Sequence, residues 1–326
     1  MKNIFTTSLT GDNLIVTPNG IKSVVSLKEG DLILTDKGTL PLLHKEVYAG
    51  MSTKVIDKQY NILATVEITT KVGANSAHST KDINKPFKID KVKHLKFDKQ
   101  DVAIDPYFLG LWLADGTSCS TQITSHNNDV EIHRYLKRYA DSLGQKVSSF
   151  KSSENSHKYS IVGAGEGNTL QKLLIEENLT NNKHVPEHYM NNDVETRMQL
   201  LAGMLDGDGY VTPYSFKLEL KSELLIRNIQ RIADSLGFKT SLISQRKRCT
   251  NSKTKAVGTY WKLSICGNNI HNIPTKLARK QFNETDGKRD NSKVLVTFTN
   301  IQADILYKLS FSDPKAKLIT STGITI

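Results

Sequence analysis

Two nearly matching segments constrain the fold of this chain more than any other feature. They are Phe108-Leu-Gly-Leu-Trp-Leu-Ala-Asp-Gly116 and Leu201-Ala-Gly-Met-Leu-Asp-Gly-Asp-Gly209, and each has the apolar pattern of a short helix that ends at Asp-Gly. Asp115 precedes Asp208 by 93 residues, and the same 93 residues separate the two copies of Ala-Asp-Ser-Leu-Gly, which begin at Ala140 and Ala233. The matched spacing indicates an internal duplication, so we expect two similar repeats.

Each repeat continues with the same order of elements. After the acid-tipped helix comes a strand pattern, then an amphipathic helix that ends at Gly144 or Gly237, where glycine favours a helix stop. The expected elements are strands at 122–124 and 216–220, helices at 130–143 and 223–236, and strands at 158–162 and 259–265. Each half therefore predicts helix, hairpin, helix, hairpin, which is an α+β arrangement.

The residues on both sides of the duplication have β character. Residues from about 8 to 67 form short Val, Ile and Leu runs separated by turn signals, and strand patterns return at 294–298 and 305–309. We expect this tail to complete the first β module across an inserted domain. The expected limits are 1–100 for the β module with its linker, 101–290 for the duplicated domain, with repeats at about 101–192 and 193–290, and 291–326 for the end of the β module.

Small residues recur four positions apart within each duplicated segment. Gly110 is followed by Ala114, and Gly203 by Gly207, so one face of each helix lacks bulky side chains and the two helices can pack closely. Such packing brings the two Asp-Gly tips together, and carboxylates that close favour a shared divalent cation such as Mg²⁺. Two metal ions at such a site can stabilise the attacking and leaving oxygens of a phosphoryl displacement.

The alternative interpretation is that each Asp-Gly only ends a helix and begins a turn. One motif alone would favour this alternative. The duplication in register favours the shared site.

Charge and cysteine usage narrow the class of protein. The 44 Lys and Arg residues exceed the 33 Asp and Glu residues, and the net charge of +11 favours a polyanionic partner, with a merely solvated basic surface as the alternative. The three cysteines are scattered without a CxxC pair, so we expect neither a disulfide framework nor a zinc module, and a reducing compartment. No stretch approaches the ~20 apolar residues that span a bilayer, so we expect neither a secreted nor a membrane protein.

Both duplicated segments resemble the dodecapeptide motif of LAGLIDADG homing endonucleases, the second closely and the first as a variant with Trp112 and Leu113. The resemblance implies that Asp115 and Asp208, with the glycines that follow them, Gly116 and Gly209, form the site of the catalytic metals. Asp206 has Leu113 as its counterpart, so we expect a structural role for this acid.

The resemblance extends over nearly the whole chain to the branch that contains the yeast vacuolar ATPase intein and the HO endonuclease. It implies a duplicated endonuclease domain of two αββαββα repeats with pseudo-two-fold symmetry, inserted in a degenerate all-β Hint (intein-like) domain. The segments 11–38 and 306–326 resemble the opening and the close of that β domain.

In the relatives a lysine after each repeat assists catalysis. The segment Asn182-Lys-His-Val-Pro186 resembles the first such segment, so Lys183 is the candidate that polarises the attacking water or stabilises phosphate charge. The second falls in Leu277-Ala-Arg-Lys-Gln281, where Lys280 is preferred over Lys276 and Arg279. The alternative for each lysine is an ordinary surface residue.

A basic hairpin tip is the candidate surface for DNA, because a two-stranded ribbon fits the major groove. Phosphate anchoring is the expected role of this tip, and base readout by Arg246 or Arg248 is left open. The lysine-rich passage from Lys71 to Gln100 is either a solvated linker or a basic arm that follows phosphates. The candidate DNA-binding residues are Arg246, Lys247, Arg248, Lys253, Lys255, Lys91 and Lys93.

The groups that protein splicing needs are missing. Thr7 or Ser8 aligns with the usual nucleophile, Val66 replaces the activating histidine, and the end at Gly323-Ile-Thr-Ile326 has no His-Asn pair. We therefore expect no splicing. The cysteine-rich zinc tail of the HO endonuclease is absent as well.

The sequence thus predicts a free-standing, intein-derived, site-specific endonuclease that hydrolyses both strands of duplex DNA with Mg²⁺, for which Mn²⁺ can substitute. We expect a monomer that recognises a long, partly asymmetric site in the nucleus, or otherwise in the cytoplasm, without a membrane partner. The main alternative is an inactive LAGLIDADG-type DNA- or RNA-binding protein, a maturase or a regulator. A third, autoprocessing by the β module, is disfavoured by the missing groups.

Overall fold

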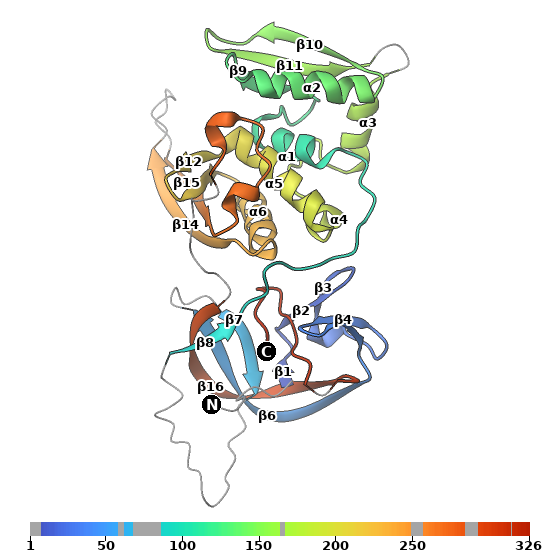
Figure 1. Ribbon diagram of the computed structural model, residues 1–326, viewed down its shortest axis with the longest axis vertical. Helices are drawn as coiled ribbons and strands as arrows, with labels where there is room; N and C mark the ends of the chain where they lie inside the picture. The colour runs from blue at the N-terminus through green and yellow to red at the C-terminus, as the bar shows by residue number, and fades with distance from the viewer. Residues whose placement is uncertain are drawn as a thin grey trace, which may run out of the picture. The chain divides into compact units, whose positions relative to one another are not determined.

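The computed structural model describes residues 8–57, 62–67, 86–163, 167–248, 257–283, 293–313 and 315–326. The chain forms two compact units, one made of Met1–Asp98 with Asp290–Ile326 and the other of Lys99–Arg289 (Figure 1). Among the described residues, no helix combines the length and the apolar character that crossing a membrane requires.

The first unit contains a five-stranded antiparallel sheet in the order β1-β7-β6-β16-β8. The long strand β16 pairs with β6 from Val296 to Ser310 and also with β1 and β8, so segments far apart in sequence share one sheet. Two hairpins, β2–β3 and β4–β5, complete the unit. The strands are β1 Ser8–Thr10, β2 Leu14–Thr17, β3 Gly20–Ser23, β4 Leu32–Thr35, β5 Gly38–Pro41, β6 His44–Asp57, β7 Ile62–Glu67, β8 Phe87–Asp90 and β16 Lys293–Ser310, and Val24–Ser26 form a 3₁₀ turn.

The C-terminal residues pack into the core of this unit. Leu318 and Ile324 are buried with Ile15 and Ile33, and bridges join Ile15 to Thr320 and Thr35 to Leu318. The C-terminal residues and the first strands therefore belong to the same hydrophobic core. Membership of this unit in the intein class stays a prediction.

The expectation of a linker or arm from Lys71 to Gln100 is wrong for its described part. β8 pairs with β16, and Leu95 and Phe97 are buried against Val16 and Ile319. Apolar side chains stand between the lysines of this passage, and their burial stabilises the packed structure. The prediction counted the charges and overlooked these apolar residues. Residues 71–85 lie outside the described part of the chain.

The second unit is built around two central helices, α1 (Pro106–Asp115) and α5 (Val194–Asp208). Asp105 caps the first helix by accepting from the backbone N–H of Phe108 at 2.9 Å, and Asp193 caps the second by accepting from Thr196 at 2.8 Å. Their apolar side chains belong to one core that spans both repeats.

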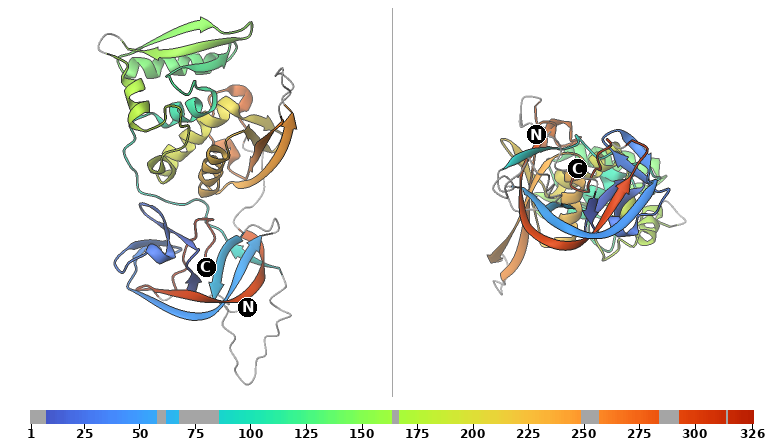
Figure 2. Two further views of the ribbon diagram at one scale, coloured as in Figure 1. Left: turned by 180° about the vertical axis from the view of Figure 1, so that it is seen from behind. Right: turned by 90° about the horizontal axis from the view of Figure 1, so that it is seen from below.

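Each repeat adds a sheet and an amphipathic helix that covers it. In the first, α2 lies along a three-stranded sheet of order β10-β11-β9, and in the second α6 covers a four-stranded sheet of order β12-β13-β15-β14, as the front and rear views both show (Figures 1 and 2). The first repeat contains β9 Ile123–His126, α2 Val130–Ser142, β10 Lys146–Lys151, β11 Ser156–Val162, α3 Thr169–Glu176 and α4 Glu187–Met190. The second contains β12 Tyr210–Thr212, β13 Ser215–Leu220, α6 Glu223–Ser235, β14 Lys239–Arg248, β15 Val257–Cys266 and the 3₁₀ turns Ile270–Asn272 and Ala278–Lys280.

The expected αββαββα order is wrong in detail in the first repeat. Among its described residues the first hairpin is reduced to β9 and one bridge between Gly116 and Ile123. The indole N–H of Trp112 donates to the carbonyl of Ser120 at 2.7 Å, and the N–H of Thr117 donates to Gln122 at 2.8 Å. These bonds hold the chain in a tight turn where the second repeat has β12.

The second repeat also departs from this order, because two 3₁₀ turns stand in place of its last helix in the described part. The buried carboxylate of Asp206 accepts from the backbone N–H groups of Lys276, at 2.6 Å, and Leu277, at 3.4 Å. These donors are therefore satisfied without a helix.

Candidate functional site

The contact between α1 and α5 depends on two glycines. A Cβ added to Gly110 would lie 2.0 Å from the carbonyl oxygen of Leu200, and one added to Gly203 would lie 2.0 Å from that of Tyr107. Backbone therefore touches backbone at both positions, and any side chain would separate the helices. The close packing predicted from the small residues is confirmed.

This packing brings the acidic ends of the two helices together. A Cβ added to Gly207, next to Asp208, would lie 3.1 Å from Oδ2 of Asp115. Asp115 is half-buried, whereas Asp208 is exposed. Both carboxylates stand at helix C-termini, where the partial charge of the helix is negative and a further negative charge is unfavourable.

The protonation of the two acids reflects this crowding. The pKa of Asp115 is raised to about 7, first by burial and then by the charge of Asp208, against the opposing charges of Lys280 and Lys183. The pKa of Asp208 is also raised, because packed protein atoms displace water from part of its surroundings although the side chain reaches solvent, and the two lysines again oppose the shift. Burial therefore disfavours the ionised form of both acids, and the charge of Asp208 adds to this effect at Asp115.

One lysine lies beside the end of each central helix. The ammonium of Lys183 donates to the carbonyls of Gly116 at 2.7 Å, Leu113 at 3.1 Å and Ala114 at 3.4 Å. The ammonium of Lys280, which is buried, donates to those of Asp206 at 2.6 Å, Leu205 at 2.9 Å and Gly207 at 3.1 Å. The two lysines thus occupy equivalent places in the two repeats.

The alternatives to Lys280 lie elsewhere. The ammonium of Lys276 lies over the rings of Tyr107, at 4.1 Å, and Tyr135, at 4.9 Å. The guanidinium of Arg279 pairs with Asp129 at 2.6 Å. Lys280 is therefore the basic residue of this segment whose ammonium binds the carbonyls at the end of α5.

The three N–H donors of each lysine all have backbone partners, and the cations offset the negative ends of the helices. Burial lowers the pKa of both lysines, against the charges of the nearby aspartates. The catalytic role of each lysine stays a prediction.

Asp206 is a buried acid next to the site. Its side chain is 3% exposed, and it accepts a hydrogen bond of 2.6 Å from the hydroxyl of Tyr107, which belongs to the other repeat. Burial raises the pKa of this carboxyl, against the hydrogen bonds and the charge of Lys280 that favour its ionised form. These contacts agree with the structural role expected for it.

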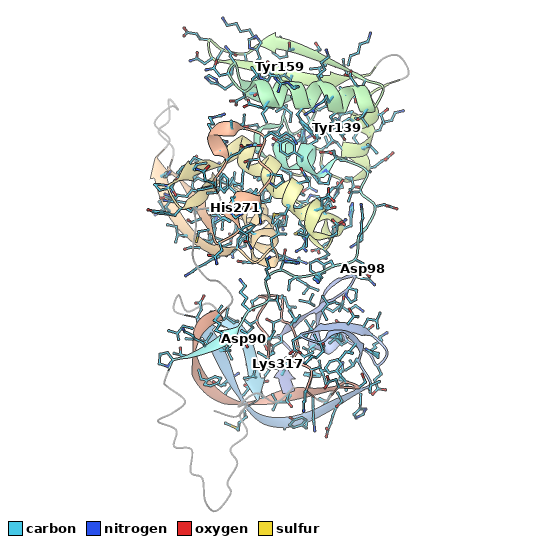
Figure 3. The ribbon with its side chains drawn as sticks, in the orientation of Figure 1. Asp90, Asp98, Tyr139, Tyr159, His271 and Lys317 are labelled. Atoms are coloured by element: carbon cyan, nitrogen blue, oxygen red, sulfur yellow. The ribbon has the colours of Figure 1, made fainter. Side chains whose placement is uncertain are left out.

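Sequence reasoning missed an aromatic cluster next to these groups. Tyr107 and Tyr135 meet edge to face with ring centroids 4.6 Å apart, and the hydroxyl of Tyr135 donates to Asp105 at 2.6 Å. Tyr139, labelled in Figure 3, stands one turn further along α2. Its ring centroid lies 5.1 Å from that of Phe108. The spacing of Tyr135 and Tyr139 on the apolar face of α2 was the signal available.

The predicted DNA-binding residues are divided between the two units. Arg246 and Lys247 are exposed on β14, and Lys247 pairs with Glu219. Arg248 ends that strand, while Lys253 and Lys255 lie outside the described residues. Lys91 and Lys93 belong to the first unit, where the backbone of Lys91 bridges Ile324. A DNA contact by any of them stays a prediction.

The donor set at the helix ends fits a divalent cation. Within the described part of the chain, no group of three or more His, Cys, Asp or Glu side chains is placed to hold a metal. Two carboxylates, completed by water and by phosphate oxygens, are nevertheless the kind of ligand set with which Mg²⁺ is bound. Burial and the charge of Asp208 raise the pKa of Asp115 to about 7, and a bound cation would favour the ionised form of this carboxyl.

Comparison with known proteins gives a family match for part of the chain. Residues 184–283 match the homing endonuclease family model. That match contains Asp208 and Lys280 and begins after Asp115 and Lys183. It supports the predicted resemblance at the level of homing endonucleases, and the branch within them stays open.

Curated relatives are similar over part of their length. The chain is 25% identical over 203 residues to a replicative DNA helicase DnaB of Mycobacterium intracellulare, covering 62% of this chain and 31% of that protein. It is 25% identical over 167 residues to the homothallic switching endonuclease of Saccharomyces cerevisiae, covering 44% of this chain and 28% of that protein. The chain therefore spans about a third of the length of these relatives.

Solved structures of the homing endonuclease I-DmoI are also similar. One, described as mesophilic variants of that enzyme, has a TM-score of 0.38 at 13% identity and covers 54% of this chain and 94% of its own. Another, in complex with DNA and Ca, has a TM-score of 0.37 at 14% identity and covers 52% of this chain and 87% of its own.

Proposed function

We propose that the second unit is a metal-dependent, site-specific endonuclease that hydrolyses one phosphodiester bond in each strand of duplex DNA. The observation that carries this proposal is the pair of carboxylates at the ends of two glycine-packed helices, each with a lysine beside it. The homing endonuclease family match over the second repeat supports the same class of reaction. The pseudo-symmetry of the two halves supports one half for each strand.

Each residue has a distinct task in this proposal. Asp115 and Asp208 would hold Mg²⁺ or Mn²⁺, with the backbone at Gly116 and Gly209 alongside. The cation supplies positive charge for the oxygens of the scissile phosphate. Lys183 and Lys280 hold the helix ends in place and bring two further positive charges to the phosphate that enters between them. Arg246 and Lys247 offer exposed charge for the DNA backbone.

We further infer that the first unit is a remnant of an intein-like domain without splicing activity. The hydroxyl of Tyr48 donates to Ser8 Oγ at 2.7 Å, and the next residue, Leu9, pairs with Val66 in the sheet. Val66 is buried and apolar, so no imidazole stands at this position to activate Ser8. We also propose that the protein is a monomer that acts on chromosomal DNA in the nucleus, at a long, partly asymmetric site.

The test compares cleavage by matched variants. Purified protein is incubated with Mg²⁺ and genomic DNA of the source organism, and new ends are mapped by sequencing for the wild type, Asp115→Asn and Asp208→Asn. Asp141→Asn is the control, because Asp141 is an exposed residue of α2. We expect cuts at one or few sites that both site variants lose and the control keeps.

The opposite result has a clear meaning. DNA that is bound but stays intact in Mg²⁺ and in Mn²⁺ would contradict the proposal. The chain would then act as a nucleic-acid binder. The structural reason for the absence of cleavage would be that backbone carbonyls already occupy the N–H donors of Lys183 and Lys280.

A further inference from the structure

The segment that carries Lys280 is held by the other repeat. Lys276 lies over the rings of Tyr107 and Tyr135, and Arg279 pairs with Asp129 through two hydrogen bonds of 2.6 and 3.2 Å. These three partners belong to α1 and α2 of the first repeat or to the residue that precedes α2. The position of Lys280 therefore depends on contacts that cross the boundary between repeats.

Asp206 is the centre of this arrangement. Its carboxylate accepts from the Tyr107 hydroxyl on one side and from the N–H groups of Lys276 and Leu277 on the other. Its own carbonyl accepts from Lys280 at 2.6 Å. One residue thus ties the first repeat, the 275–280 segment and the buried ammonium together.

The first repeat holds its lysine without such a residue. Leu113 occupies the position equivalent to Asp206, and Lys183 instead lies 5.1 Å from the centre of the Trp112 ring. The segment around Lys183 contacts both repeats, since the N–H of Asn181 donates to Ser118 at 2.8 Å and that of Val185 to the side chain of Asn228 in α6 at 3.2 Å, but neither bond involves Asp206. A change at Asp206 should therefore reach one lysine and spare the other.

We propose that Asp206 is a positioning residue that sets Lys280, through the cross-repeat contact with Tyr107 and the backbone of the 275–280 segment, and so controls one of the two strand cleavages. Its effect on cleavage rests on the proposed nuclease function. Its effect on the position of Lys280 does not.

The first experiment measures the position of the two lysines without DNA. Full-length protein is labelled with trace acetic anhydride at fixed pH, and mass spectrometry follows modification of Lys280, Lys183 and the exposed Lys137. In Asp206→Asn we expect Lys280 to react about tenfold faster, as for a locally opened segment, with Lys183 unchanged relative to Lys137. Asp193→Asn, at the other end of α5, is the control, because asparagine also caps helices.

A milder variant covers the case in which Asp206→Asn does not fold. Tyr107→Phe removes one hydroxyl and keeps the ring, and we expect the same selective exposure of Lys280 with a smaller increase. Equal reactivity of Lys280 in the wild type and in a folded variant would overturn the proposal. Equal gains at both lysines would do the same, because they would indicate general loosening.

The second experiment measures the two strands separately. A duplex that contains the mapped cut is labelled at each 5′ end, and single-turnover rates are compared for the wild type, Asp206→Asn, Lys280→Met and Lys183→Met. We expect Asp206→Asn to slow by about tenfold the strand that Lys280→Met slows, leaving the other strand within about twofold, so that nicked DNA accumulates. A general structural defect would slow both strands alike and overturn the proposal. If the wild type itself leaves DNA uncut, the nuclease function fails while the labelling result still decides the positioning role.

Discussion

The two repeats reach the same arrangement of acid and lysine by different local chemistry. In the first, Trp112 and Leu113 precede the acidic tip, and the indole both fixes the following turn and faces Lys183. In the second, Leu205 and Asp206 stand at the same positions, and the carboxylate accepts from the backbone N–H groups of Lys276 and Leu277 in the segment that carries Lys280. The helix contact and the acids are kept in both copies, while the means of holding each lysine differ. Duplicated halves can thus share a geometry without sharing the residues that support it.

The helix contact is where the repeats should behave alike. Gly203→Ala and Gly110→Ala each place a methyl group against a carbonyl of the opposite helix. We expect each to lower the free energy of unfolding of the second unit by about 3 kcal/mol, since the backbones must separate. Urea denaturation measures this change. A loss of unfolding free energy in only one of the two variants would show that the two glycine contacts are not equivalent.

The buried indole is where the repeats should differ. Trp112→Leu, which copies Leu205 into the first repeat, leaves a cavity and frees the carbonyl of Ser120. We expect a loss of about 3 kcal/mol in unfolding free energy and faster acylation of Lys183, with Lys280 still protected. Thermal unfolding and amine labelling test both parts. Exposure of both lysines would mean that the two supports are not independent.

The acidic tips predict a dependence of stability on pH. An acid whose pKa is higher in the folded state binds its proton more tightly there, so its contribution to stability is complete below the ordinary value of 3.8 and is lost as the pH rises through about 7. We expect Asp115→Asn to stabilise the metal-free protein by about 2 kcal/mol at pH 8 and to have little effect at pH 4. Denaturation at the two pH values measures the difference. Asp208→Asn should give a smaller gain, because its carboxylate is exposed.

The same titration should govern metal binding. A cation must displace the proton from Asp115, so we expect affinity for Mg²⁺ or Mn²⁺ to increase from pH 6 to pH 8, across the pKa of about 7. Isothermal titration calorimetry of the DNA-free protein measures the change, with Asp115→Asn as the control. Affinity that stays constant over this range would contradict the predicted role of Asp115.

The smallest effect should come from the half-buried ion pair between the repeats. Arg279→Gln removes the pair with Asp129, in which the arginine is 55% exposed and the aspartate 11% exposed. We expect a loss of about 1 kcal/mol in unfolding free energy, because solvent screens the arginine but reaches little of the aspartate. Denaturation in low and high salt measures it. A loss as large as that of Trp112→Leu would show that this contact, and not Asp206, holds the 275–280 segment.

Much of the site could be predicted because its determinants are local. Glycine spacing on one helix face, an acid at the helix end and a repeat in register all lie within short stretches of sequence, and the helix contact followed from them. The stops at Gly144 and Gly237 likewise agree with helices that end at Ser142 and Ser235. The choice of Lys280 over its neighbours came from the family resemblance, since three basic residues stand within five positions.

The sequence by itself determined the duplication, the two packed helices and the pair of acids, because side-chain size and periodicity act between near neighbours. Only the tertiary structure decided that Asp206 joins the two repeats, that Lys276 lies over tyrosines, and that Leu95 and Phe97 belong to a core and not to a linker. These outcomes depend on contacts between residues far apart in the chain, such as Tyr107 and Asp206. Their free energies arise only when folding brings the partners together and excludes water from between them.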